Sequence, residues 1–132
     1  MENQPTQEQI KEFWEWCGFS QQNYGKKKSG GKYHNEVWET EVDDIRWISP
    51  GNFDCGFYLP SVDINNIFKY ASPKLTNIKL SKTDTNEYFV AVVTEYNPLE
   101  KESKAFNRDP ALALFWAIWK VIHNERNLIL LL

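Results

Sequence analysis

Three consecutive residues near the end of the chain could bind a nucleotide. Phe106, Asn107 and Arg108 offer an aromatic ring, an amide and a guanidinium, and Asp109 then begins a predicted helix. A helix N-terminus favours anions, because its first N–H groups lack partners within the helix and its dipole is positive there. The sequence therefore predicts a phosphate or ribose contact at Arg108. The alternative is that Arg108 pairs with a neighbouring carboxylate on the surface.

A second group of cations and aromatic rings lies in the first half of the chain. Arg46 and Trp47 are neighbours in a predicted strand, where the guanidinium could stack on a ring or bind phosphate. Lys32 belongs to residues 22–35, which are rich in lysine and glycine; backbone N–H groups of such segments can hold phosphate. It is no Walker A motif, because Gly31 stands where the lysine is required. We expect a mobile loop or hairpin tip, either inert or acting as a lid over an anionic ligand.

Other chemistries lack their characteristic spacing. The cysteines and histidines are Cys17, Cys55, His34 and His123. They show no metal-ligand spacing, and Ser49 lacks the flanking glycines of a nucleophile elbow. In a strand, Glu39, Glu41 and Asp43 would share one face, which is typical of a solvated surface. We therefore expect no catalytic residues, no metal, no cofactor and no enzyme activity.

Periodicity and capping signals predict an α+β fold, with an antiparallel sheet and about three helices packed on it. The helices are expected at 6–18, where Thr6 and Gln9 form a capping box, at 63–71, and from Asp109-Pro110 to about residue 123. Strands are expected at 37–42, 45–48 and 53–59, and a hairpin at 75–96 turns at 84–86. We expect loops at 22–35 and 97–107.

Length and charge restrict the class of protein. The chain has 132 residues, which fits a single domain spanning 1–132, and its net charge of −3 argues against binding long nucleic acid. It lacks a run of apolar residues long enough to span a membrane, so we expect a cytoplasmic protein with reduced cysteines. The apolar residues 128–132 are expected to dock, either on the chain's own sheet or on a second subunit.

Three runs of sequence carry a resemblance to a known family. GFYLP (56–60), DINNIFKYASPKL (63–75) and DPALAL (109–114) resemble phage-encoded "ABA sandwich" domain proteins, over about residues 55–122. The resemblance implies an antiparallel sheet that carries helices. Some similar phage proteins are Thoeris anti-defence sponges, oligomers that bind cyclic ADP-ribose isomers or cyclic oligonucleotides without cleaving them. It supplies no ligand residues for this chain.

Two hypotheses about function follow. The first is a phage or prophage anti-defence protein in the cytoplasm of an infected bacterium, a homo-oligomer that sequesters a cyclic nucleotide second messenger. Its ligand-binding residues would be Phe106, Asn107, Arg108, Arg46, Trp47 and Lys32. The alternative is a protein-interaction module that inhibits a host enzyme through an acidic and aromatic surface.

Overall fold

A computed structural model describes the backbone of residues 4–94 and 102–131, and the side chains of these residues up to 124. The described helices are α1 (Gln7–Trp16), α2 (Ile64–Ala71), α3 (Pro110–Leu131) and a 3-10 turn at Ser72–Lys74. The described strands are β1 (Ser20–Tyr33), β2 (Glu36–Ile48), β3 (Asp54–Gly56), β4 (Asn77–Lys82), β5 (Tyr88–Val93) and β6 (Ser103–Asn107). No described helix is both long enough and apolar enough to span a membrane.

The predicted α+β class with three α-helices and antiparallel strands is confirmed for the described residues. The strands form two separate three-stranded sheets, in the orders β1-β2-β3 and β4-β5-β6. Each strand pairs only with its neighbour in sequence, so the two sheets share no strand. The chain accordingly divides into two compact units, residues 18–59 and residues 1–17 with 60–132, which we call the hairpin unit and the helical unit.

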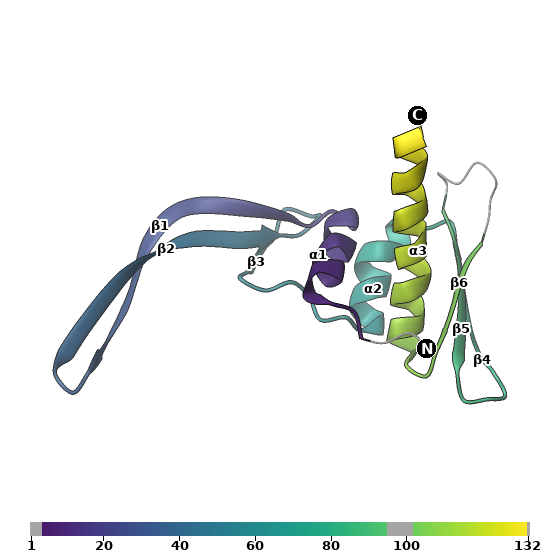
Figure 1. The fold of residues 1–132 in the computed structure, drawn as a ribbon, viewed down its shortest axis with the longest axis horizontal. Coiled ribbons are helices and arrows are strands. Elements are labelled where there is room, and N and C mark those ends of the chain that lie inside the picture. Colours follow the sequence, from purple (N-terminus) through teal and green to yellow (C-terminus); the bar gives the residue numbers. More distant parts are fainter. Residues whose placement is uncertain (1–3, 95–101, 132) are drawn as a thin grey trace. The chain divides into compact units, whose positions relative to one another are not determined.

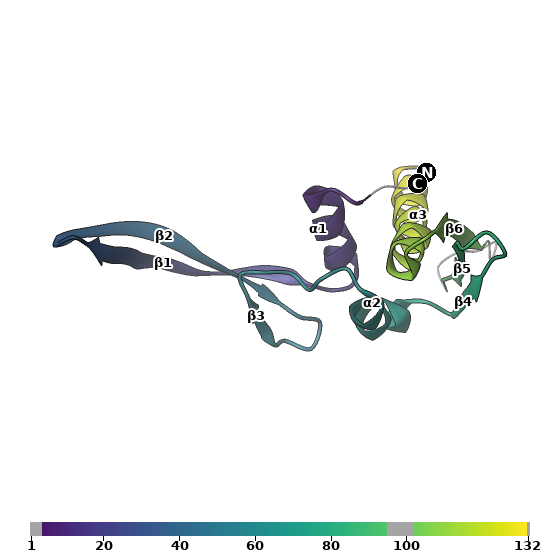
Figure 2. The same cartoon turned by 90° about the horizontal axis from the view of Figure 1, so that it is seen from below.

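The core of the helical unit is built around α3. In Figures 1 and 2, α3 lies between α1 and the β4-β5-β6 sheet. Phe115 on α3 is fully buried and stacks on Phe13 of α1 with ring centroids 4.6 Å apart. On the sheet side, the Ser103 hydroxyl donates to the Ala117 carbonyl oxygen at 2.6 Å. The apolar face of α3 therefore holds both the N-terminal helix and the sheet.

The predicted helix starts are confirmed. Thr6 accepts a hydrogen bond from the Gln9 backbone N–H at 3.2 Å, and the Gln9 side chain accepts one from the Thr6 N–H at 2.9 Å. Gly18 follows α1 with a φ of 108°, a conformation that glycine adopts without a steric penalty. Asp63 caps α2 by accepting from the Asn66 N–H at 2.8 Å.

The cap at Asp63 gives a stability prediction. We expect Asp63→Ala to lower the free energy of unfolding by about 1 kcal/mol, because the first turn of α2 loses an acceptor for its N–H groups. Urea denaturation followed by circular dichroism measures this. The exposed residue Lys69 of the same helix serves as a control, since Lys69→Ala should change the midpoint little. An unchanged midpoint for Asp63→Ala would contradict the role of the cap.

Of the two predictions for residues 22–35, a mobile loop or a hairpin tip, the loop is wrong, because residues 22–33 are strand, whereas the turn of the hairpin does lie at 34–35. β1 pairs with β2 in register from Tyr33↔Glu36 to Ser20↔Ile48, with one irregularity between Asn23 and Lys26. The two residues at the turn, His34 and Asn35, have φ values of 47° and 67°. Positive φ at both positions is what a tight two-residue hairpin turn requires. The predicted strands 37–42 and 45–48 are accordingly one continuous strand, β2.

Three other boundaries differ from expectation. The strand predicted at 53–59 is shorter, because only β3, Asp54–Gly56, pairs with β2. Of the predicted loop 97–107, residues 103–107 form β6, because they complete the sheet by pairing with β5; residues 97–101 lie outside the described part. The last helix continues to Leu131 instead of ending near 123, since no glycine or proline follows His123 to stop it. The side chains of 128–132 are not described, so their docking stays a prediction.

Candidate functional site

The six residues predicted to bind a ligand divide between the two units. Lys32, Arg46 and Trp47 belong to the hairpin unit, whereas Phe106, Asn107 and Arg108 belong to the helical unit. Each group is therefore considered within its own unit.

Arg46 is occupied by carboxylates of its own unit. Its guanidinium donates to both oxygens of Asp44, at 3.0 and 3.2 Å, and to Asp54 at 3.0 Å. The guanidinium also lies 5.2 Å from the ring centroid of Tyr24 and 5.7 Å from that of Phe57. These partners raise the pKa of Arg46, and the Arg46 hydrogen bond lowers the pKa of Asp44. Arg46 ties β2 to the β3 segment and is not available as a free phosphate ligand.

Trp47 and Lys32 do not join Arg46 in one pocket either. Trp47 is 7% exposed, so its ring is not free to stack on a base. Lys32 pairs with Val37 beside the hairpin turn, whereas Arg46 pairs with Gln22 toward the other end. Residues 22 to 32 of β1 span roughly 30 Å, at about 3.3 Å per residue. A single nucleotide cannot contact both cations.

The outer face of the β4-β5-β6 sheet does bring predicted residues together. Val90, Val92 and Ala105 point into the core, so the alternating residues on β5 and β6 face outward. Phe106 is 52% exposed and contacts Phe89 of the neighbouring strand, with ring centroids 4.9 Å apart. This ring pair is an aromatic platform on an open sheet face.

Cations surround the aromatic platform. Lys104 lies two residues before Phe106 on β6, and Arg108 lies two residues after it. Lys79 and Lys104 share one carboxylate, that of Glu102, at 3.5 and 3.8 Å. Arg108 is exposed and makes no ion pair with the described residues. The platform therefore carries a net positive charge beside one exposed ring, Phe106, and one half-buried ring, Phe89.

Backbone N–H groups at the start of α3 already have hydrogen-bond acceptors within the chain. The Asn107 side-chain oxygen accepts from the Asp109 N–H at 2.9 Å, and the Asp109 carboxylate accepts from the Ala111 N–H at 2.8 Å. A carboxylate of the chain thus occupies the position where an anionic ligand would bind the helix start. Any anion at this end of the sheet must rely on Arg108 and the lysines, and Asn107 acts as a turn residue.

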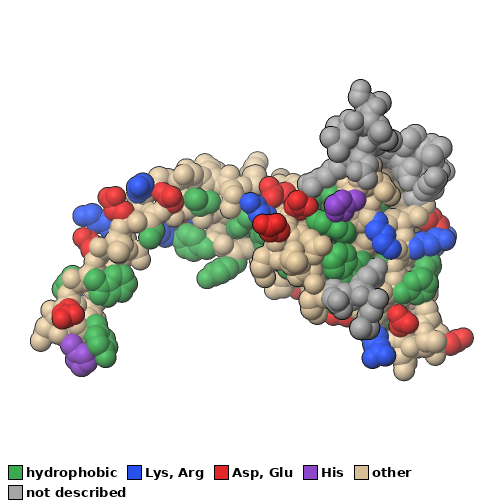
Figure 3. Space-filling model, viewed as in Figure 1, with side chains coloured by type: hydrophobic (Ala, Val, Ile, Leu, Met, Phe, Trp, Pro, Cys, Tyr) green, Lys and Arg blue, Asp and Glu red, His purple; other side chains and the backbone are tan. Residues whose placement is uncertain are grey.

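The hairpin unit has its own exposed apolar surface. Cross-strand register places Tyr33, Trp38 and Val42 on one face of the β1-β2 ribbon. Lys27 is on the same face, and its Nζ lies 4.2 Å from the centroid of the Phe57 ring. We call the side chains of Tyr33, Trp38, Val42 and Phe57 the aromatic face. Each is at least 38% exposed. Figure 3 shows hydrophobic side chains along the inner curve of the hairpin and mostly charged ones along its outer curve.

The opposite face of the hairpin is charged. Lys26 lies opposite Asp43 and Lys28 opposite Glu41, while the Lys28 ammonium is 3.8 Å from the Glu39 carboxylate. The prediction that Glu39, Glu41 and Asp43 share a solvated face agrees with this register. These acids are balanced by lysines of β1, so they do not form a uniformly acidic surface.

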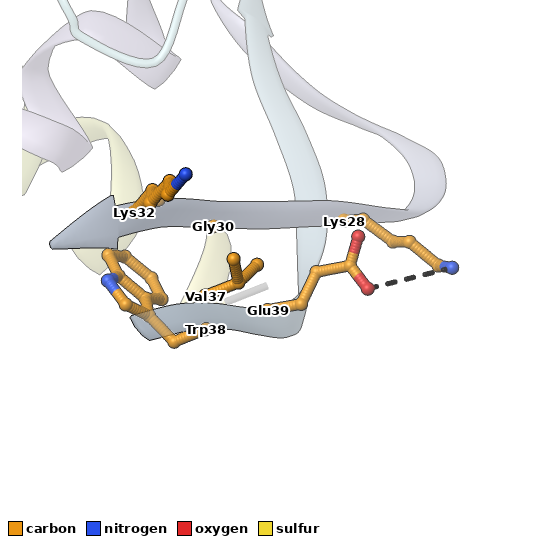
Figure 4. A pocket seen from close by; sticks show the side chains of 7 residues that line it. Lys28, Gly30, Lys32, Val37, Trp38 and Glu39 are labelled. Carbon is orange, nitrogen blue, oxygen red and sulfur yellow. Dashed lines mark ion pairs between the residues drawn. The ribbon is translucent and has the colours of Figure 1, made fainter. Parts of the chain in front are cut away.

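A shallow hollow of about 370 Å³ lies at the hairpin end that contains Lys32. It is lined mainly by residues of the charged face, together with Gly31 and Trp38; these residues are Lys28, Gly30, Lys32, Val37 and Glu39 (Figure 4). A Cβ at Gly30 would collide with the Trp38 carbonyl oxygen, and one at Gly31 would lie 3.1 Å from the Trp38 ring. The two glycines therefore allow the close approach of β2 and leave room beside the indole.

Sequence reasoning missed the half-buried Phe89 and the exposed Trp38 as residues of the candidate surfaces. Both belong to strands, in which successive side chains point to opposite faces. The sequence shows which residues share a face, but which of the two faces is buried depends on the packing of other elements. The pairing Phe89↔Phe106 also depends on β6, which was expected to be a loop. A longer strand prediction for 103–107 would have shown Lys104 and Phe106 on one face.

The fold defines the protein as α+β, with a helical unit that carries a sheet and a hairpin unit built on a long two-stranded ribbon. Searches of protein-family models, of curated proteins and of solved structures find no match for the chain. The resemblance to phage "ABA sandwich" proteins therefore stays a prediction. In the described residues, no group of three or more His, Cys, Asp or Glu side chains could hold a metal ion.

Proposed function

We propose that the protein binds a nucleotide on the outer face of the β4-β5-β6 sheet. The observation that carries this proposal is the contact between the exposed Phe106 ring and the half-buried Phe89 ring, with Arg108 and Lys104 beside them. Any base can stack on an aromatic ring, and cations on the same face of the sheet attract the phosphate of the nucleotide. These groups favour binding of the nucleotide and not its turnover, because phenyl rings supply stacking, and arginine and lysine supply positive charge.

The sequestered ligand in this proposal is a cyclic nucleotide second messenger, the class that the family resemblance implies. A cyclic nucleotide presents a flat base and a phosphate within a few ångströms of each other. Phe106 and Arg108 are separated by one residue, so their side chains can serve the base and the phosphate of the same molecule. The net charge of −3 for the whole chain is compatible with this, since the cations gather locally.

Titration calorimetry with cyclic ADP-ribose isomers and cyclic di- and trinucleotides tests the proposal. We expect Phe106→Ala to weaken binding by about 1–3 kcal/mol through lost stacking, and Arg108→Ala by about 1.5–3 kcal/mol through a lost charged hydrogen bond. Lys82→Ala, an exposed residue at the end of β4, is a control that should bind normally. No heat with any of these ligands would refute the proposal, and intact ligand recovered after denaturation separates storage from cleavage.

The aromatic face of the hairpin supports a second candidate, a module that docks on a host protein. Apolar side chains exposed together on one face of a ribbon are typical of protein-binding surfaces. The acidic residues contribute less than expected from the sequence, because lysines lie beside them. A photo-crosslinker at Tyr33, 70% exposed, should join the chain to one host protein in high yield. Crosslinking to the chain's own copies alone would count against this candidate.

A further inference from the structure

Two lysines meet one carboxylate beside the aromatic platform. Lys79 of β4 and Lys104 of β6 are both register partners of Ala91 on β5, and Lys104 lies two residues from Phe106 on the same face of β6. Two residues of a strand span about 7 Å, so the lysines form the row of side chains next to the exposed ring. The Lys79 ammonium lies 3.5 Å from Oε1 of Glu102, and the Lys104 ammonium lies 3.8 Å from Oε2.

The contacts of Glu102 with these lysines are weak. Both are longer than the roughly 2.7–2.9 Å of a close hydrogen bond between charged groups. The three side chains are 36–63% exposed, and water and salt screen ion pairs in such positions. An ammonium has three N–H donors, and a contact with one oxygen of Glu102 uses one of them. The Glu102 carboxylate therefore occupies an anion position from which another anion can displace it.

Positive charge exceeds negative charge around this carboxylate. A third ammonium, that of Lys120 on α3, donates to the carbonyl oxygen of Lys104 at 2.7 Å. Three lysines thus gather near the one carboxylate that pairs with Lys79 and Lys104 among the described residues. A phosphate offers more acceptor oxygens than a carboxylate, so it can satisfy donors of both ammoniums at once.

We propose that Lys79 and Lys104 form a second phosphate subsite, in which a phosphate of the ligand replaces Glu102. This inference rests on the proposed nucleotide site, where Arg108 binds a phosphate on the other side of Phe106. Lys104 and Arg108 are four residues apart, roughly 13 Å along the strand direction. Two phosphates that are separated by a sugar match this spacing. Adjacent phosphates of a diphosphate would have to draw both groups of cations together over the ring.

The second subsite defines the class of nucleotide. A ligand with one phosphate reaches Arg108 and leaves the contacts of Glu102 intact. A ligand with two separate phosphates, such as a cyclic dinucleotide, binds Arg108 and also exchanges Glu102 for its own oxygens. The ligand class is therefore a nucleotide with two separate phosphates, and Glu102 lowers the affinity for it by competing at the lysines.

Titration calorimetry with three cyclic adenine nucleotides tests the second subsite. Cyclic AMP has one phosphate, cyclic ADP-ribose has two adjacent phosphates, and cyclic di-AMP has two separate ones. We expect cyclic di-AMP to bind about tenfold tighter than cyclic ADP-ribose, the effect of a further charged hydrogen bond, although the two ligands carry the same charge. If they bind equally, the second subsite is wrong and the proposed function stands. If none of the cyclic nucleotides binds, the proposed function itself is refuted.

Three variants assign the preference to the lysines. Lys79→Met keeps the apolar stem and should weaken the binding of cyclic di-AMP about tenfold, and that of cyclic AMP less. Glu102→Gln should strengthen the binding of cyclic di-AMP, because no carboxylate then competes with the phosphate. Lys82→Met is the matched control, since Lys82 is exposed on the same strand and its register places it on the opposite face. Unchanged or weaker binding by Glu102→Gln overturns the proposal, and so does an equal loss in Lys82→Met and Lys79→Met.

Discussion

Phe115→Ala should lower the free energy of unfolding by about 3–5 kcal/mol, the usual cost of removing a large ring from a packed core. Phe115 is fully buried, stacks on Phe13 at 4.6 Å and meets Trp116 edge to face at 5.0 Å. Its loss leaves a cavity between α1 and α3. Because small domains are stable by only about 5–15 kcal/mol, this change approaches the whole stability of the helical unit. Urea denaturation of the variant measures the effect.

Two companion variants separate a cavity from a general effect of losing a phenyl ring. Phe115→Leu keeps most of the volume and should cost less than Phe115→Ala. Phe106→Ala removes the same ring from a position that is 52% exposed, and should cost under about 1 kcal/mol. If Phe106→Ala destabilises the chain as much as Phe115→Ala, the assignment of Phe115 to the core and Phe106 to the surface is wrong.

Arg46→Met should loosen the base of the hairpin, because it removes the cation shared by Asp44 and Asp54. Asp44 is 9% exposed and would be left with Lys27, 3.8 Å away, as its remaining cation. We expect hydrogen exchange at the β2-β3 pairing to become about tenfold faster or more, as the loss of charge-assisted hydrogen bonds implies. Exchange followed by mass spectrometry localises the change. Lys28→Met is the control, since its pair with Glu39 is exposed on both sides.

The same cluster predicts a pH dependence with a definite sign. The Arg46 hydrogen bond holds the pKa of Asp44 below its ordinary range, and the Gly56 N–H together with Arg46 does the same for Asp54. A carboxyl whose pKa is lower in the folded state stabilises the fold above its unfolded pKa, about 3.9, and loses that contribution as the pH falls through the folded value. The protection factors at the hairpin base, which compare its exchange with that of an unfolded chain at the same pH, should therefore be high at neutral pH and fall below about pH 4. In the Arg46→Met variant, the protection of the hairpin base should be weak both at neutral pH and below about pH 4.

The helix signals in the sequence were sufficient to predict where the helices begin, because these signals are local. The capping box at Thr6 and Gln9, the cap at Asp63 and the proline after Asp109 each act within one turn of their helix, so their residue types predict the helix starts directly. The β4-β5 hairpin was predicted for the same reason, since a short turn joins an alternating run to a run rich in β-forming residues. Where the expected helix end failed, near His123, the sequence lacked any local stop signal.

The candidate site was harder to predict, because exposure and charge balance depend on contacts between distant residues. Arg46 reads from the sequence as a possible phosphate ligand, yet Asp54 reaches it from the next strand. Trp47 reads as a stacking ring, yet it is buried. Phe106 reads as a candidate ligand-binding ring, and it is 52% exposed. Its contact with Phe89 comes from a strand pairing that no sequence spacing could reveal.

By itself, the sequence determined the α+β class, the starts of the helices and the solvated face shared by Glu39, Glu41 and Asp43. These follow from interactions within a few residues or from the period of a strand. Only the tertiary structure decided that residues 22–33 are strand, that the strands form two sheets, and which aromatic rings remain exposed. The physical reason is that a strand is completed by a partner elsewhere in the chain. The lysine- and glycine-rich residues of β1 become a strand once β2 supplies the hydrogen bonds and the opposite charges.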